Sequence, residues 1–391
     1  MSINQEKYNI KFTNFNKSQD DILKFDVINA NSAFVNTLRR IIISHVKTIS
    51  FDTTDYEKSD LKIIDNTSSF HNEFLLHRLG LIPIYGNPDV YDPSKYKFSL
   101  NIENTGSELM NITTEHIKVL NIETNIEEKN DTFFKKNSIT NDYILIATLN
   151  PGPNLKGEKL KFEGKSSINI GESHIRFSPV SCIYFVNKQD PELVKLELNK
   201  YLEINKDKFN VKKLTHKFML EEADRYFHID DDGNPNQFEF CIESRGVLEP
   251  YKILLNGINL IIDKINLFLN NIKKTLSDTK SDVLITESKG LMKAFDITIL
   301  NENHTLGYLL QTYINEIYKE NNIFIGYLNP HPLEKKIILK ISLPNINIDQ
   351  VNEIINTTCK QLLTILDNIK KEISSEFGGK VIIRKKQNKT K

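Results

Sequence analysis

Apolar residues recur every three or four positions in two segments near the start of the chain, and this spacing predicts two amphipathic helices. In the first segment Asn31 and Ser32 can cap the helix, and the periodic residues are Phe34, Leu38, Ile41, Ile42 and Val46. In the second, Ser68 and Ser69 can cap the helix, Gly80 and Pro83 end it, and the periodic residues are Phe70, Phe74, Leu75 and Leu79. The first stripe is wide enough to cover a sheet together with a second helix or a partner.

The residues before the first helix alternate between apolar and polar, which predicts two strands separated by a polar turn. The alternating residues are Tyr8, Ile10 and Phe12 in the first strand, and Leu23, Phe25 and Val27 in the second. A short strand is expected at 62–64. Together these elements predict an α+β unit with its helices on one face of a small sheet.

Beyond Pro83 the sequence becomes turn-rich at 85–97 and then breaks into short alternating segments. These segments predict a β-rich insertion with strands near 98–104, 117–122, 143–149, 168–170 and 175–185. The charged residues of 187–230 favour helical or irregular structure, and 238–244 alternates again, as a strand does.

A long apolar stripe begins at Pro250, a residue suited to a first helical turn, and continues to Leu276. Residues 278–292 read as a linker into a second unit. The apolar pattern of that unit predicts a strand at 295–299, a helix at 306–317, strands at 324–327 and 336–341, and a helix at 348–377. Asn347 and Gln350 can form a capping box at the start of this last helix, and Gly378 is expected to end it.

Composition excludes several classes of protein. The chain has 391 residues with 51 Lys and Arg against 51 Asp and Glu, whereas a protein that grips DNA with its whole surface is usually basic. The three cysteines, Cys182, Cys241 and Cys359, are far apart, which argues against a disulfide framework or a four-thiolate zinc site. Neither a secretory leader nor a membrane-spanning run is expected.

Four local motifs permit sharper interpretations, but the plainer ones are favoured. EGKSS at 163–167 resembles part of a phosphate-binding loop, although Lys159 stands where the motif requires glycine. The acidic stretch 228–239 has partial calcium-loop spacing, but it begins with a histidine and precedes a strand. His77 and His331 have no nucleophile or carboxylate pattern beside them, so structural roles are favoured. The basic tail 381–391 suits a solvated chain end.

Several phrases resemble one known family. NTLRRIII at 36–43, HRLGLIPI at 77–84 and the segment FEFCIESRG at 238–246 resemble the dimerisation domain of RNA polymerase assembly subunits. These are the third-largest subunit of eukaryotic RNA polymerase II, the archaeal D subunit and the bacterial alpha subunit. ENHTLGYLL at 302–310 and IGYLNPHPLE at 325–334 resemble their small partner, the eleventh or archaeal L subunit. Tyr308 and Gln311 depart from that pattern, which usually has Asn and Arg there.

The resemblance implies an α+β fold in which two such dimerisation units form an intramolecular pseudo-heterodimer. It assigns 1–84 and 236–277 to the first domain, 85–235 to a β-rich insert with a charged connector, 278–292 to a linker, 293–380 to the second domain and 381–391 to a tail. Residues 85–97 contain no cysteine, so the zinc loop of the eukaryotic subunit is not carried over, and no metal or cofactor is expected.

The implied function is a non-catalytic platform on which a DNA-dependent RNA polymerase assembles. Its implied partners are the two largest and the small polymerase subunits, with DNA contacted only through the complex and no membrane. Fusion of the two partners suggests a large DNA virus, hence virion and host cytoplasm; otherwise the nucleus or cytoplasm is expected. A stand-alone nucleic-acid-binding module is the alternative, and an enzyme that acts alone is less favoured.

The resemblance also names the residues expected at subunit interfaces. We expect Arg39 and Arg40 to hold a carboxylate or carbonyl of a large subunit, since a guanidinium donates in a planar fork. The full set is Asn36, Leu38, Arg39, Arg40, His77, Arg78, Leu79, Gly80, Thr305, Leu306, Gly307, Leu310, Gly326, Tyr327, His331 and Pro332.

Overall fold

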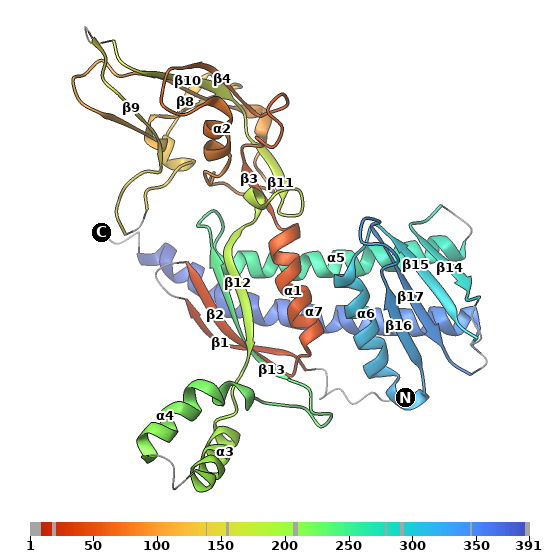
Figure 1. The fold of residues 1–391 in the computed structure, drawn as a ribbon. Helices are drawn as coiled ribbons and strands as arrows, with labels where there is room; N and C mark the ends of the chain where they lie inside the picture. Colours follow the sequence, from red (N-terminus) through yellow and green to blue (C-terminus); the bar gives the residue numbers. More distant parts are fainter. Residues whose placement is uncertain are drawn as a thin grey trace.

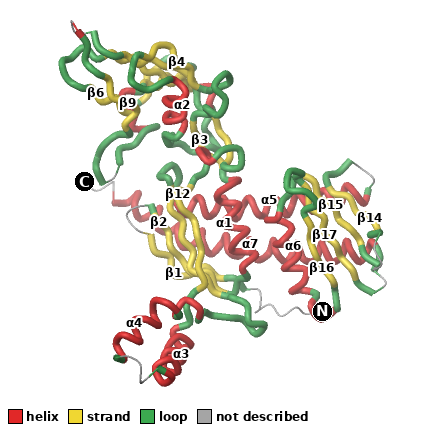
Figure 2. Tube along the Cα trace, viewed as in Figure 1, coloured by secondary structure: helices red, strands yellow, loops and turns green. Residues whose placement is uncertain are grey.

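The computed structural model describes residues 9–17, 21–137, 139–153, 156–205, 210–277, 280–289, 293–344 and 346–387, and for 378–387 only the course of the backbone. Tyr8 and residues 388–391 of the expected tail lie outside the described residues. Two four-stranded sheets stand on either side of a group of four helices, and two further units project from this body (Figure 1). Figure 2 shows the same view with the helices in red and the strands in yellow.

Both four-stranded sheets are antiparallel, and one lies in each half of the chain. The first contains, in spatial order, β1 (Lys11–Lys17), β2 (Ile22–Ile28), β13 (Gln237–Ser244) and β12 (Val180–Asn187). The second contains β14 (Val283–Glu287), β15 (Phe295–Leu300), β17 (Lys336–Ser342) and β16 (Phe324–Leu328). The α-helices are α1 (Ser32–His45), α2 (Asn72–Gly80), α3 (Pro191–Ile204), α4 (Val211–Glu221), α5 (Pro250–Leu276), α6 (His304–Ile317) and α7 (Ile348–Gln387).

The two sheets and their helices repeat one order along the chain. In what we call the first half, β1 and β2 precede α1, and β12 and β13 precede α5. In the second half, β14 and β15 precede α6, and β16 and β17 precede α7. The spatial order of the strands is the same as well, because in each sheet the last strand in sequence lies between the second and the third. The halves therefore share one topology.

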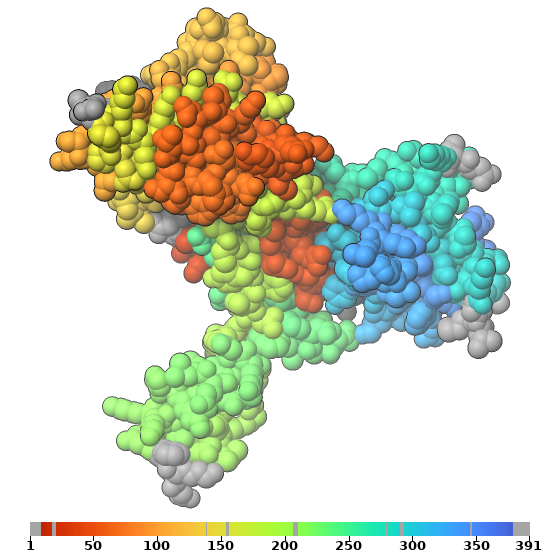
Figure 3. All heavy atoms as spheres, turned by 45° about the horizontal axis from the view of Figure 1, so that its top comes forward, coloured from red at the N-terminus to blue at the C-terminus, as the bar shows by residue number. Residues whose placement is uncertain are grey.

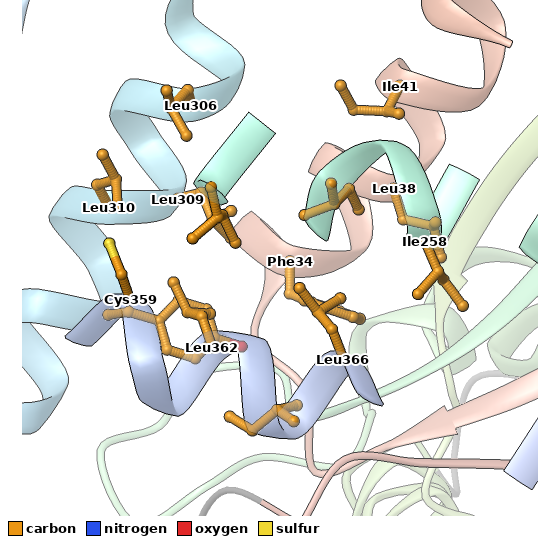
Figure 4. Packing of buried hydrophobic residues seen from close by; sticks show 14 of the residues in the cluster. Phe34, Leu38, Ile41, Ile258, Leu306, Leu309, Leu310, Cys359, Leu362 and Leu366 are labelled. Carbon is orange, nitrogen blue, oxygen red and sulfur yellow. The ribbon is translucent and has the colours of Figure 1, made fainter. Parts of the chain in front are cut away.

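Four helices join the halves. Helix α1 contacts α5 of its own half and α6 of the other, and α7 contacts α6 of its own half and α5 of the other. Figure 4 shows how their apolar side chains meet, with Phe34 and Leu38 of α1 close to Ile258 of α5 and Leu362 and Leu366 of α7. These residues belong to one buried cluster that extends from the first sheet to the second, so the halves have a common core.

Local features of α1 and α5 explain this close packing. The side chain of Asn31 caps α1 by accepting a hydrogen bond from the backbone N–H of Phe34 at 2.9 Å, as the sequence predicts. At Gly257 of α5, a Cβ atom would lie only 2.6 Å from Cγ1 of Ile42. Glycine therefore lets the backbone of α5 approach α1 more closely than any other residue would allow.

Helix α5 is also long and apolar enough to cross a membrane by length and composition. Its apolar residues instead pack inside the protein, since eleven of its 27 residues are buried, and it contacts α1, α7 and β14. Its composition is that of a core helix.

A second, separate core lies in what we call the β-rich unit, residues 47–178. Its largest sheet has the order β4 (Leu61–Asn66), β10 (Lys159–Gly164), β5 (Tyr96–Glu103), β7 (Lys118–Asn121) and β8 (Ile126–Glu128). Two smaller sheets pair β3 (Lys47–Ser50) with β11 (Ser167–Ile170), and β6 (Met110–Thr113) with β9 (Leu145–Leu149).

The position of this second core corrects two boundaries expected from the sequence. Strand β4 and helix α2 belong to the β-rich unit, because Leu61, Leu75 and Leu79 are buried in its core. Strand β12 belongs instead to the sheet of the first half, where it pairs with β13. The chain therefore leaves the common core directly after α1 and returns at β12, not at the expected positions 84 and 235.

Three other expectations need correction. The expected linker 278–292 contains β14, whose apolar residues Val283 and Ile285 extend the second sheet. Helix α2 begins at Asn72 with His71 as its cap, because the side chain of Asn66 draws Ser68 into a turn before the helix. Helix α7 continues through Gly378 to Gln387.

The charged segment after β12 is helical, as expected. Helices α3 and α4 form what we call the arm, a small unit that projects away from the common core (Figure 1). Its own buried cluster consists of Val194, Phe218 and Ala223.

The end of α7 ties the second half to the first. Phe377 is 8% exposed and stacks on Tyr251 of α5 with ring centroids 5.1 Å apart, and it meets Phe15 of β1 edge-on at 5.2 Å. We expect Phe377→Ala to lower the free energy of unfolding by about 3–5 kcal/mol, since it removes a buried ring from a packed site. Urea denaturation measures this loss.

The matched control is Leu333→Ala, which shortens a side chain that is 88% exposed. It should change the free energy of unfolding by less than about 0.5 kcal/mol. Equal effects of the two variants would show that Phe377 does not join the halves.

Candidate functional site

The contact between α1 and α6 brings together four of the expected interface residues. Leu38, Leu306 and Leu310 are all buried in the common core. Beside them the hydroxyl of Thr37 donates to the backbone oxygen of Thr305 at 3.4 Å. These residues hold the two halves together inside the chain.

A second polar contact lies at the start of the same helix. The side-chain amide of Asn31 donates to Oε1 of Glu316 on α6 at 3.0 Å. Asn31 therefore caps its own helix with its oxygen and binds the other half with its nitrogen.

Arg39 and Arg40 lie half-exposed on α1 and form no ion pair with any residue that the structure describes. The guanidinium of Arg39 donates to Oδ1 of Asn36 from Nε at 3.2 Å and from a terminal nitrogen at 3.0 Å. Burial and the neighbouring charge of Arg40 lower the pKa of Arg39. This pair of cations could bind a carboxylate or a row of carbonyl groups.

Tyr327 of β16 lies over α6 near these cations. Gly307 makes room for it, since a Cβ atom there would be 2.8 Å from Cδ2 of the ring. Burial raises the pKa of Tyr327, and the charge of Arg40 is close enough to act against that rise. Tyr308, one of the two departures from the family pattern, is 40% exposed, with its ring 6.3 Å from that of Tyr327.

The other departure, Gln311, has a local function. Its Oε1 accepts a hydrogen bond from the backbone N–H of Tyr327 at 3.2 Å. An arginine there could not accept that hydrogen bond, because a guanidinium only donates.

The expected residues on α2 lie elsewhere, inside the β-rich unit. Arg78 donates to the backbone oxygens of Ile146 at 3.0 Å and Leu145 at 2.9 Å, so it fastens α2 to β9. Leu79 is fully buried, and Gly80 is packed against the guanidinium of Arg176. Neither Leu79 nor Gly80 is on a surface that another subunit could contact, which corrects the expectation for these two residues.

Four expected residues remain near solvent, apart from the contact between α1 and α6. His77 is exposed on α2, and His331 and Pro332 are exposed in the loop between β16 and β17. The Nδ1 atom of His331 accepts the backbone N–H of Leu333 at 3.2 Å, a turn-forming role. Gly326 lies half-buried in β16.

Sequence reasoning missed two arginines, one inside the β-rich unit and one that ties this unit to the first half. Arg176 is 2% exposed and donates to the backbone oxygen of Phe51 at 3.1 Å and to the hydroxyl of Thr53. Arg245, just after β13, donates to the backbone oxygens of Ser178 at 3.2 Å and Leu81 at 3.1 Å. Burial lowers the pKa of both groups.

The groups that accept from these arginines are mostly backbone carbonyls, which leave no periodic pattern in the sequence. The arginines themselves were therefore the only available signal.

The local motifs also have structural explanations. Gly164 ends β10, where a Cβ atom would lie 2.0 Å from the backbone oxygen of Asp60, so EGKSS is a close strand contact and not a phosphate loop. In the acidic stretch, Oδ1 of Asp230 accepts the backbone N–H groups of Asp232 at 3.0 Å and Asn234 at 2.8 Å. Across the described ranges, no three His, Cys, Asp or Glu side chains gather in a way that could hold a metal ion.

Comparison with known proteins gives the family. The model of the RNA polymerase Rpb3/Rpb11 dimerisation domain matches residues 24–265, more than half of the 391 residues. The chain belongs to the Rpb3/Rpb11 dimerisation-domain family. A second model with the same description matches residues 294–372.

Several relatives of the chain are named as polymerase subunits. The chain is 29% identical over 182 residues to the DNA-directed RNA polymerase subunit Rpo3 of Methanobrevibacter smithii, covering 45% of this chain and 58% of that subunit. It is 25% identical over 284 residues to subunit RPAC1 of RNA polymerases I and III of Saccharomyces cerevisiae, covering 61% of this chain and 80% of that subunit. It is 22% identical over 286 residues to subunit 3 of RNA polymerases II, IV and V of Arabidopsis thaliana, covering 62% of this chain and 85% of that subunit.

We expect His45 to make the stability of this family member sensitive to pH. Its Nε2 lies 3.5 Å from Oε2 of Glu172, which in turn binds Lys335 of the second half at 3.0 Å. Burial, helped by the charge of Lys264, lowers the pKa of His45. Protonated His45 is therefore more favourable in the unfolded chain than in the folded chain. The free energy of unfolding consequently decreases as the pH falls below about 6.5.

We expect urea denaturation to show a larger loss of stability between about pH 7.5 and 5.5 in the native chain than in His45→Asn. His77→Asn, which alters an exposed histidine, should keep the native pH dependence. The interpretation fails if His45→Asn loses as much stability as the native chain.

Proposed function

We propose that this chain is a non-catalytic assembly subunit of a multisubunit DNA-directed RNA polymerase, with both partners of the dimerisation platform in one polypeptide. One observation carries the proposal: two halves of equal topology pack four helices into one core. Matches of two separate dimerisation-domain models, one to each half, support it. The relatives named as polymerase subunits support a role in polymerase assembly.

The platform is a pseudo-heterodimer in this proposal, with α1 and α5 facing their counterparts α6 and α7. The β-rich unit is an insertion between α1 and β12 of the first partner. Joining the partners makes their pairing intramolecular, with an effective concentration of order mM for a connection of suitable reach. Such fusion favours a large DNA virus as the source, with the protein in the virion and host cytoplasm.

The two largest polymerase subunits dock on the surfaces outside the common core. Arg39 and Arg40 are the best candidates for such a contact, because they are half-exposed and have no ion pair among the described residues. Tyr327 and Tyr308 extend the same region onto the second half. Aromatic and arginine side chains are those most enriched among the residues that dominate binding energy.

Tagged chain purified from the cells that produce it tests the function. The proposal predicts two very large polymerase subunits in near-equal amounts with the chain at moderate salt, identified by mass spectrometry. Recovery of the chain alone, or with unrelated proteins, would contradict it.

The docking site has its own test. We expect Arg39→Ala with Arg40→Ala to reduce the large subunits recovered at least tenfold, since losing two charge-assisted contacts costs more than about 1.4 kcal/mol. The free chain should keep its melting temperature within a few degrees, because both side chains are half-exposed and neither forms part of the common core.

The control is Lys370→Ala with Lys371→Ala, which removes an adjacent pair of exposed cations from α7. It should leave recovery unchanged. If both double variants assemble equally well, Arg39 and Arg40 are not the docking site.

A further inference from the structure

Strand β12 forms one edge of the first sheet, and its backbone is unpaired on the outer side. Lys188 donates from its N–H to the backbone oxygen of Gln237 on β13 at 2.9 Å. Hydrogen-bonded positions alternate along an antiparallel pair, so the backbone N–H and C=O groups of Tyr184 and Val186 also point toward β13. The N–H and C=O groups of Ile183, Phe185 and Asn187 point to the open side. Within the described part of the chain, nothing hydrogen-bonds to those groups.

The edges of the two four-stranded sheets differ in how they are protected. Strand β1 carries Lys11 and Lys17, and its register with β2 is shifted. Strand β14 has only five residues and includes Glu287. On β16 the N–H of Tyr327 is taken by Gln311. Charges, short length, bulges and capping side chains are the usual means of keeping an edge from pairing with another chain.

Strand β12 has none of these protections along its central residues. Its eight residues, VSCIYFVN, include no charge and no proline, and its register with β13 shifts only between Val180 and Cys182, at its start. Tyr184 and Val186 point away from the helices and are 44% and 48% exposed. A long, uncharged edge with exposed apolar side chains is a template for another strand.

The surroundings of β12 limit what can pair with it. The strand connects the β-rich unit to the arm, and these two units project at its two ends (Figure 3). Eight residues of strand span about 27 Å, so the gap accepts a short extended segment. A second copy of this chain would bring its own β-rich unit and arm into the same gap.

We propose that β12 binds an extended segment of another polypeptide, which adds to the first sheet as a fifth strand. The segment pairs with the free N–H and C=O groups of Ile183, Phe185 and Asn187. Its outward side chains are apolar at alternate positions, to cover Tyr184 and Val186. This is the β-strand addition mode of peptide recognition. The inference goes beyond the proposed function, since docking through Arg39 and Arg40 does not require it.

Photocrosslinking in the producing cells tests this proposal. Val186 is replaced by p-benzoylphenylalanine, the cells are irradiated, and the crosslinked peptide is mapped by mass spectrometry after tagged purification. The same replacement is combined with Asn187→Pro or, as a matched control, Asn187→Ala. Only proline removes the N–H at the free edge, and proline is tolerated at such an edge because the pairing with β13 stays intact.

The expected result is one crosslinked segment of a different polypeptide, with apolar residues at alternate positions. Its yield should fall at least tenfold with Asn187→Pro and stay unchanged with Asn187→Ala. If Asn187→Pro unfolds the chain, Tyr184→Lys against Tyr184→Phe makes the same comparison through the exposed face.

Three results would overturn the inference: no crosslink, a crosslink only to a second copy of this chain, or equal yields with proline and alanine. Failure of the proposed function gives a different result, because polymerase subunits would then be absent from the purified material whether or not a crosslink forms.

Discussion

The apolar contact among α1, α5, α6 and α7 is the interaction on which the rest of this structure depends. Each helix has one side on its own sheet or partner helix and another on the opposite half, so neither half can bury its helices alone. Separating them would expose side chains such as Leu38, Leu310 and Leu362, each worth about 1.5–3 kcal/mol of burial. The halves are therefore parts of one core and not two domains on a tether.

The same packing fixes where the exposed groups stand. Because α1 lies between α5 and α6, Arg39 and Arg40 are held beside the second half, where the charge of Arg40 reaches Tyr327. The β-rich unit is oriented by polar contacts instead, because Arg245 of the first half donates to the backbone oxygens of Ser178 and Leu81. Because a hydrogen bond requires a narrow range of distance and angle, these contacts fix an orientation that apolar packing alone would not.

Periodicity predicted most of the helices and strands of the common core, because each presents one apolar face to it. It could not assign β4, α2 and β12 to their units, since an apolar strand or helix looks the same whichever core buries it. The strand β14 was missed because its apolar residues are few and lie beside linker-like sequence. Gly378 does not end α7, because propensity is weak against the context of a long helix already packed on both halves.

The candidate site was predictable only in part. Leu38, Thr305, Leu306 and Leu310 were identified through phrases in the sequence, and they meet in the structure. Leu79 and Gly80 come from an equally distinctive phrase but serve the interior of the β-rich unit. A family motif identifies residues that are needed either for the fold or for an interface. Only the burial of these residues in the structure distinguishes the structural role from the interface role.

Cutting the chain between its halves tests the shared core most directly. A protease site placed in the connection between α5 and β14 can be cleaved after folding, and the product analysed by size exclusion at low micromolar concentration. We expect the two fragments to stay together as a one-to-one complex with a single unfolding transition, because neither half can bury its helices alone. Separation into two folded fragments with independent transitions would contradict it.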